Sequence, residues 1–497
     1  MPRPLPARRK PSLRKSNKRR PSDSPQSRSG ICLLRLFLCA ESMSIAPSSA
    51  LLLPNIRRFL LFRALFNARF YYPVFTVLFL DFGLSLEQFA LLNTAWAFVI
   101  VLAEVPSGAL ADLWGRKRLL VMSSVLLALA MLLPALAPAG SPLVFWFFLL
   151  NCILGGLAEA MSSGSDEALA YDSLVERSLT EQWPLVLDRK MRAQSLAFIL
   201  AMTLGAAVYD HEFLNRLCTI LGLPVHIGHS LSMRLPLILS CLFAVAATVV
   251  TLGMREPLPA AEERSHPQAR HALFILSLRT WHAALWVLRT PFALAILLLT
   301  MSMDHTLRML ATLTSPYYRL IGLPDSSFGL IGSAIAVLGL AVPRLARLMV
   351  ERLPPACNAL FLGLAMLEIL CPLVRFIPLY GVLPMAGVFI GMMLCSFFAS
   401  HYLNAITSSA RRATVLSFKG MACNVAFGCI GMGFAALTHH ERLLLIPQHP
   451  DAPAAVLEQL AFKAALGWAP GYLAAALLAA CLPALVALFW QRPSPRR

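Results

Sequence analysis

Charged residues are scarce in this chain. Only 14% of its 497 residues are Asp, Glu, Lys or Arg, whereas a soluble domain carries about 25%. Hydrophobic residues make up 58%, which excludes an ordinary soluble enzyme and also excludes disorder over most of the chain. Acidic residues are the scarcer kind, 25 against 43 basic ones. The resulting net charge of +18 makes a nucleic-acid partner the first alternative to test.

Several chemical signatures are missing as well. The eleven cysteines form no CxxC pair and lie mostly in apolar runs, so we interpret them as small buried side chains. The sequence shows no phosphate-binding loop, zinc-ligand spacing or catalytic triad pattern. We therefore expect no metal, no cofactor and no enzymatic activity. Transport driven by ATP would need a separate ATPase.

The location of the positive charge argues against a nucleic-acid partner. Residues 1–42 hold eleven basic and two acidic residues, which is half of the net charge. The remainder contains repeated apolar runs, each long enough to cross a bilayer, which takes roughly 20 residues. The sequence therefore predicts an all-α membrane protein, with the lipid bilayer as its partner and no nucleic acid.

The apolar runs predict twelve transmembrane helices in two bundles of six. They lie near 59–80, 89–111, 119–137, 142–163, 192–209, 235–253, 291–313, 327–350, 357–373, 377–401, 412–437 and 466–490. The ninth is short and interrupted by polar groups. We divide the chain into a basic tail (1–56), a first bundle (57–253), a linker (254–290), a second bundle (291–490) and a short basic tail (491–497). The aromatic and apolar residues of the linker suit a helix at the membrane surface.

The basic segment 1–42 allows two interpretations. A twin-arginine or signal peptide would account for arginines that precede the apolar patch 31–40. The patch is too short to span a bilayer. We favour a disordered tail, or translation from Met43.

The distribution of Lys and Arg predicts the orientation. If the N-terminus is inside, the inward segments beyond residue 42 hold 23 basic residues and the outward segments six. Cytoplasmic loops are enriched in Lys and Arg. We expect a multi-pass protein of the plasma (cell inner) membrane with both termini cytoplasmic.

The loop between the second and third spans carries the most informative motif. It reads GALADLWGRKR from Gly108 to Arg118, which resembles the signature loop of the major facilitator superfamily. Glycines permit a tight turn and close helix approach, and Asp112 can pair with a cation or cap a neighbouring helix. Residues 163–174 and 404–417 are also similar to bacterial transporters of this superfamily. The predicted gate residues are Gly108, Asp112, Gly115, Arg116, Lys117, Asp166, Arg411 and Arg412.

The resemblance covers residues 57–490 and implies a secondary transporter. A small solute would bind between two six-helix bundles, and rocking of the bundles would alternate its access to the two sides. Span five (192–209) lacks the Gly/Pro-rich motif of drug–proton antiporters, which weakens the interpretation as a drug antiporter. Efflux and import both stay open. We expect a monomer with a small-molecule substrate and protons as partners. A membrane sensor or a lipid translocator on the same fold is the alternative.

Ionisable residues inside the spans are candidates for function, because a charge in the bilayer is costly. Arg69 either meets an anionic substrate or forms an ion pair with Glu104 or Glu159. Asp304 and Arg308 lie four residues apart, hence on one helix face. That pair is either a permanent contact or a proton-coupling element, since protonation would break it. The full candidate set for substrate or proton is Arg69, Glu104, Glu159, Asp304, Arg308, Lys419 and Asn424.

Overall fold

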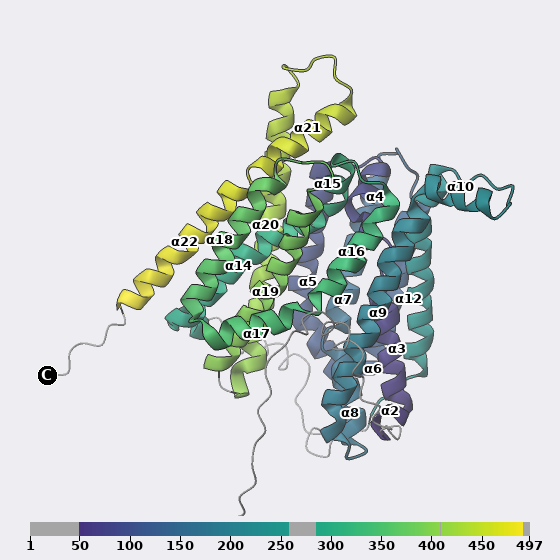
Figure 1. The fold of residues 1–497 in the computed structure, drawn as a ribbon. Coiled ribbons are helices and arrows are strands. Elements are labelled where there is room, and N and C mark those ends of the chain that lie inside the picture. Colours follow the sequence, from purple (N-terminus) through teal and green to yellow (C-terminus); the bar gives the residue numbers. More distant parts are fainter. Residues whose placement is uncertain (1–48, 258–284, 408, 491–497) are drawn as a thin grey trace, which may run out of the picture. The chain divides into compact units, whose positions relative to one another are not determined.

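The computed structural model describes residues 49–257, 285–407 and 409–490. Contacts divide the chain into two units, Met1–Ser48 and Ser49–Arg497, and all the described residues lie in the second (Figure 1). Residues 1–48 of the predicted basic tail (1–56) and residues 258–284 of the linker lie outside the described residues. The described end of the predicted surface helix, residues 285–289, is helical. Those described are helical and show no strand, as predicted.

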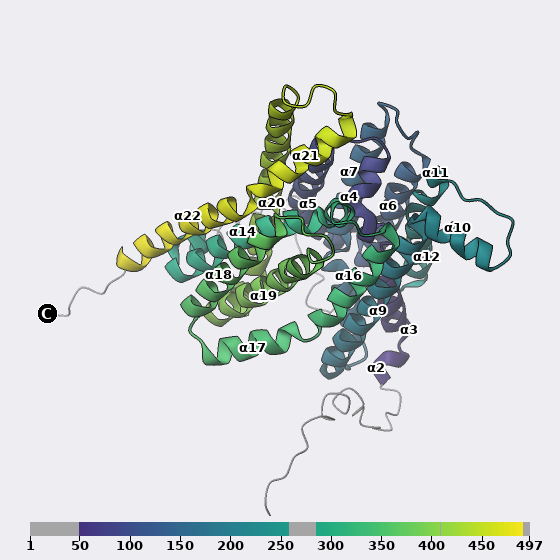
Figure 2. The same ribbon diagram turned by 45° about the horizontal axis from the view of Figure 1, so that its top comes forward.

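The helices form two groups that follow each other along the chain (Figures 1 and 2). The first contains α2 (Ser49–Leu52), α3 (Pro54–Asn67), η1 (Tyr72–Val74), α4 (Phe75–Asp81), α5 (Leu86–Trp114), α6 (Arg116–Leu136), α7 (Val144–Ser162), α8 (Ser165–Val175), η2 (Thr180–Gln182), α9 (Trp183–Tyr209), α10 (His211–Ile220), α11 (His229–Ser232) and α12 (Leu235–Gly253). The second contains α14 (Pro291–Thr312), α15 (Thr314–Leu320), α16 (Asp325–Gly339), α17 (Val342–Arg352), α18 (Pro355–Leu373), α19 (Val382–Ile406), α20 (Ser409–Leu445), α21 (Ala454–Gly467) and α22 (Ala469–Trp490).

The helix bundle has two ends, which carry different turns and short helices. The motif end is the one that carries the turn at Gly115, together with α8 and α17, at the bottom of Figure 1. The far end carries the turn at Gly83, together with α10 and α21, at the top of the same view.

Eleven helices among the described residues are long and apolar enough to cross a membrane. Together with the broken helix over residues 54–81 they make the twelve spans of the predicted fold. The ninth span, for which polar groups suggested an interruption, is the continuous helix α18. The eighth span is not one continuous helix, because α16 ends at Gly339 and a separate helix, α17, follows with a proline in its first turn.

The first span is not the continuous helix expected over 59–80. Helix α3 ends at Asn67, and the chain resumes with η1 and α4. Pro73 contributes to the break, since proline lacks an N–H and disfavours helix in the residue before it. The interruption leaves backbone groups that lipid cannot satisfy. Ser240 accepts a hydrogen bond from the Phe70 N–H at 3.0 Å, and the Arg69 guanidinium donates to the Phe66 carbonyl at 3.2 Å.

Small residues bring the two groups into contact. Helix α5 packs along α20, and α9 packs along α16. Gly329 of α16 lies against the backbone of Met202 on α9, and Gly431 of α20 lies against Thr94 on α5. A side chain at either glycine would separate the helices, so these contacts depend on the missing Cβ.

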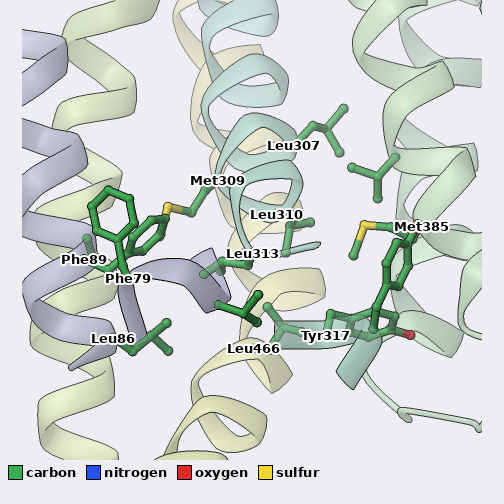
Figure 3. Packing of buried hydrophobic residues seen from close by; sticks show 14 of the residues in the cluster. Phe79, Leu86, Phe89, Leu307, Met309, Leu310, Leu313, Tyr317, Met385 and Leu466 are labelled. Atoms are coloured by element: carbon green, nitrogen blue, oxygen red, sulfur yellow. The ribbon is translucent and has the colours of Figure 1, made fainter. Parts of the chain in front are cut away.

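One apolar cluster contains residues of both groups, and part of it lies at the far end. Figure 3 shows part of it, with Phe79 and Phe89 from the first group and Met309 and Leu310 from α14. Tyr317 and Leu466 from the second group extend it. At the far end, apolar side chains of the two groups therefore pack against one another.

Gly205 on α9 provides a test of the packing around the broken span. A Cβ there would overlap the Phe70 carbonyl, whereas a Cβ at Gly433 would meet nothing within 4 Å. We expect Gly205→Ala to destabilise the protein by about 1–3 kcal/mol through overpacking, read as a lower midpoint of thermal unfolding in detergent. Gly433→Ala is the control, and equal midpoints for the two variants would contradict the tight contact.

Candidate functional site

A cavity of about 350 Å³ lies between the two groups of helices; we call it the central cavity. Its walls come from the broken first span, α5, α6, α7 and α9 on one side, and from α14, α15, α16, α19 and α20 on the other. Aromatic side chains dominate the walls, and the polar ones include Asn93, Asn151 and Ser315. The volume is within the range of small-molecule sites.

Arg69 reaches the central cavity from the break in the first span. Its guanidinium pairs with Glu159 of α7 at 2.9 Å and lies over the rings of Phe66 and Tyr72. The side chain of Arg69 is 9% exposed and that of Glu159 is 40% exposed. Of the two carboxylates considered from the sequence, Glu159 is the partner, and it ties the break to α7.

The second cation of the cavity, Arg308, is held on α14. It donates to Asp304 on the same helix and to Asn424 Oδ1 on α20 at 2.8 Å, and it lies over the Phe427 ring. The structure thus brings together three candidates, Asp304, Arg308 and Asn424. The ion pair belongs entirely to the second group of helices.

A second hollow of about 430 Å³ lies closer to the motif end; we call it the vestibule. Its lining includes Glu104, Glu159 and Asp166 from the first group and Asn424 from α20. Trp96 lines both the vestibule and the central cavity. The two hollows therefore adjoin one another and lead from the middle of the bundle toward the motif end.

The signature loop forms a tight turn between α5 and α6. Gly115 has φ of +90°, and a Cβ there would lie 3.0 Å from a Glu256 carboxylate oxygen, so the turn requires glycine. The Glu256 carboxylate accepts hydrogen bonds from the N–H groups of Arg116 (2.8 Å) and Lys117 (2.7 Å). An acidic group at this position satisfies the free donors of the α6 N-terminus. The side chain of Asp112 lies outside the described residues.

At the motif end, three ion pairs each join two different elements of the first group. Asp166 on α8 pairs with Arg63 on α3 at 3.0 Å. The other pairs are Arg116 with Asp172 and Lys190 with Glu167. They hold α8 against α3, α6 and α9, so at this end the described ion pairs do not cross between the two groups.

The far end shows the opposite arrangement. Asp81 of α4 receives two hydrogen bonds from Arg319 of α15, both at 2.7 Å. Arg319 also donates to Asp325 at 2.6 and 2.9 Å, and Tyr209 donates to Asp81. A second crossing pair joins Glu87 of α5 to Arg442 of α20 at 3.4 Å. We call these residues the far-end lock.

Asp210 adds a further crossing contact beside this lock. Its carboxylate accepts from the Ser326 N–H at 3.2 Å, across the two groups, and from the Phe213 N–H at 3.0 Å. Partial burial favours the neutral acid, but the hydrogen bonds from Phe213 and Ser326 outweigh it and lower the pKa of Asp210 below its usual value. The contact therefore persists at neutral and mildly acidic pH.

The remaining predicted residues are less central. Gly108 is exposed on α5, and the side chains of Arg411 and Arg412 lie outside the described residues. Lys419 of α20 is partly buried but lines neither the vestibule nor the central cavity. Four further charged residues of these contacts were not among those predicted from the sequence: Asp81, Glu87, Arg319 and Glu256. Each stands near a helix end, where a charge is normally solvated, and no local pattern pairs residues so far apart.

The arrangement of two six-helix groups around a shared cavity defines a membrane transporter. The sequence matches the family model of the Major Facilitator Superfamily over residues 59–435. The chain belongs to the Major Facilitator Superfamily.

Solved structures of transporters share the fold at low sequence identity. A bacterial homologue of the human lysosomal transporter Spinster, in an inward-facing and unoccupied conformation, is 15% identical, with a TM-score of 0.65 over 89% of this chain and 98% of that one. The nucleoside transporter NupG is 12% identical, with a TM-score of 0.64 over 86% and 98%. A D-xylose–proton symporter is 13% identical, with a TM-score of 0.58 over 89% and 98%. Among curated proteins, none matches the sequence at a significant level.

Asp166 provides a test of the ion pairs at the motif end. It is 1% exposed, and its removal leaves the Arg63 guanidinium without its carboxylate. We expect Asp166→Ala to lower the free energy of unfolding by about 2–3 kcal/mol, because an uncompensated buried charge is strongly destabilising.

The matched control for Asp166→Ala is Glu212→Ala, because Glu212 forms an exposed pair with Arg216 and such pairs contribute little. Thermal and denaturant unfolding of both variants in detergent checks the expectation. A change no larger at Asp166 than at Glu212 would show that the buried pair contributes nothing.

Proposed function

We propose that the chain is a secondary active transporter that moves a small solute by alternating access. The observation that carries the proposal is the asymmetry of the contacts between the two groups of helices. At the far end the groups are joined by the far-end lock and by apolar packing, whereas the vestibule leads from the central cavity toward the motif end. A solute in the cavity would exchange with one side only, and transport would require the lock to open.

The orientation follows from the loop charges. With Lys and Arg concentrated on the cytoplasmic side, the motif end and both termini face the cytoplasm. The conformation described here is then open toward the cytoplasm and closed to the outside.

Proton coupling is the second part of the proposal, and it centres on Asp304. The ionisable groups near it are Arg308 and His305 on α14, Cys395 on α19, and Lys419 and Cys423 on α20. Protonation of Asp304 would remove its attraction for Arg308 and leave that guanidinium free to turn toward a solute in the central cavity. Proton binding to Asp304 would thereby favour solute binding to Arg308.

Opening of the far-end lock is tested by labelling the cavity. A cysteine in place of Thr314, which lines the central cavity, is expected to react poorly with an impermeant maleimide applied from the far side. Asp81→Asn is expected to raise that labelling several-fold, since it removes the charge that holds Arg319. Labelling at position 314 is quantified by peptide mass spectrometry in membrane vesicles of known orientation.

Glu212→Gln, a carboxylate change at the same end within α10, is the control and is expected to leave the labelling of position 314 unchanged. If Asp81→Asn leaves it unchanged as well, the lock does not control access. Labelling that is equally fast from both sides in the parent protein would reject alternating access.

Proton coupling is tested on reconstituted protein. A deletion strain screened against toxic compounds and carbon sources identifies the solute, and liposomes then measure its flux with and without an imposed pH gradient. We expect the gradient to accelerate flux in the parent protein. Asp304→Asn is expected to abolish this dependence but to retain solute counterflow, because exchange needs no net proton movement. If the solute flux of the parent protein is the same with and without the pH gradient, proton coupling is rejected.

A further inference from the structure

The central cavity combines two positive charges with an apolar wall. Arg69 enters from the first group of helices and Arg308 from the second. Of the described residues that line the cavity, none is Asp, Glu, Lys or His. Much of the remaining lining is aromatic, including Phe75, Phe79 and Phe389. A solute that fills this space would meet positive charge and rings but no negative charge in the wall.

The carboxylates that neutralise the two arginines lie outside the lining of the cavity. Glu159 lines the vestibule, and Asp304 is in the lining of neither hollow. A guanidinium carries five N–H donors. Arg308 uses some of them in its hydrogen bonds to Asp304 and Asn424. Each carboxylate thus holds its arginine in place without occupying the cavity, and Arg308 keeps donors for a further acceptor.

A third donor, the hydroxyl of Tyr318, is without a partner. Tyr318 lines the central cavity, is 2% exposed, and its hydroxyl makes no hydrogen bond to the described residues. Buried hydroxyl groups are almost always hydrogen-bonded. A hydrogen-bond acceptor on a bound solute would give the Tyr318 hydroxyl its missing partner. The same solute would lie in the cavity that Arg69 and Arg308 also line.

We propose that the central cavity binds an amphipathic organic anion, in which a carboxylate-type head is attached to an aromatic or similarly apolar body. The head would accept hydrogen bonds from Arg308, Arg69 and Tyr318, which are strong when the acceptor is charged. The body would pack against the phenylalanines. This inference names the substrate class of the transporter proposed above and rests on that proposal.

Neutral and cationic solutes fit this cavity less well. A neutral solute of the same shape forgoes the charge-assisted hydrogen bonds. A cation would face two guanidiniums with no carboxylate in the wall, and like charges at close range repel. A small inorganic anion would leave the aromatic wall unfilled, so it would bind more weakly than an anion with an apolar body.

The test uses three probes that share one ring system. Binding of 2-naphthoate, 2-naphthamide and 2-naphthylmethylammonium is measured by isothermal titration calorimetry on the purified full chain in lipid nanodiscs. We expect 2-naphthoate to bind about tenfold or more tightly than the amide, which is the effect expected of one charge-assisted hydrogen bond. The ammonium probe is expected to show no binding.

Two sets of variants then assign the binding to the cavity. Arg308→Gln and Tyr318→Phe are expected to weaken 2-naphthoate binding and to leave 2-naphthamide nearly unchanged. Asp304→Asn is expected to strengthen 2-naphthoate binding, because it removes the carboxylate that competes for Arg308. A variant that merely damaged the fold would lower the affinity for both probes. Opposite changes in 2-naphthoate affinity for Arg308→Gln and Asp304→Asn therefore distinguish an effect on binding from an effect on stability.

The chain offers a matched control pair. Asp188 and Arg192 have the same spacing and order on a helix as Asp304 and Arg308, but they are exposed. Asp188→Asn and Arg192→Gln are expected to change neither probe's affinity. If these variants act like their cavity counterparts, the effects arise from overall charge and the proposal is wrong.

The binding measurements can overturn the anion assignment whether or not the protein transports a solute. Equal affinity for 2-naphthoate and 2-naphthamide, absence of 2-naphthoate binding, or preferred binding of the ammonium probe would each overturn the anion assignment. None of these outcomes bears on the labelling of position 314, which tests alternating access without any solute. Conversely, if 2-naphthoate binds but the labelling of position 314 shows no alternating access, the anion site stands and the proposed transport function is rejected.

Discussion

An unpaired charge inside a bilayer is energetically costly, and this constraint organises the centre of the molecule. The guanidinium of Arg69 stabilises the break in the first span through the Phe66 carbonyl and pairs with Glu159. Arg308 is held by Asp304 and Asn424. The carboxylate that compensates each cation is not among the residues that line the central cavity. The interior can therefore keep two positive charges at the wall of a hollow without leaving either of them unpaired.

The same constraint makes the closure at the far end reversible in principle. The contacts between the two groups there combine apolar packing with polar pairs at helix ends, of which Asp81 with Arg319 has the best geometry. Such pairs form close to water, so separated partners can be solvated again. At the motif end the ion pairs among the described residues hold α8 within the first group. That group can then move there as one body.

Much of the fold was predictable, because hydropathy and loop charge act locally along the chain. The spans, the two-bundle layout and the turn at Gly115 follow from apolar run length, from the linker position and from glycine spacing. The i,i+4 pair of Asp304 and Arg308 was predictable for the same reason. The break at residues 68–71 was not, because a run of apolar residues with one arginine has the hydropathy of a continuous helix. Its stability depends on Ser240, which is 170 residues away.

The sequence by itself determined the class of protein, the number of spans, the family resemblance and which charges had to be explained. Only the tertiary structure decided which carboxylate pairs with Arg69, that Glu256 caps α6, and that Asp81 and Arg319 close one end. The physical reason is the range of the interactions. Burial and helix periodicity are properties of neighbouring residues, whereas an ion pair or a cavity wall exists only when packing brings distant helices together.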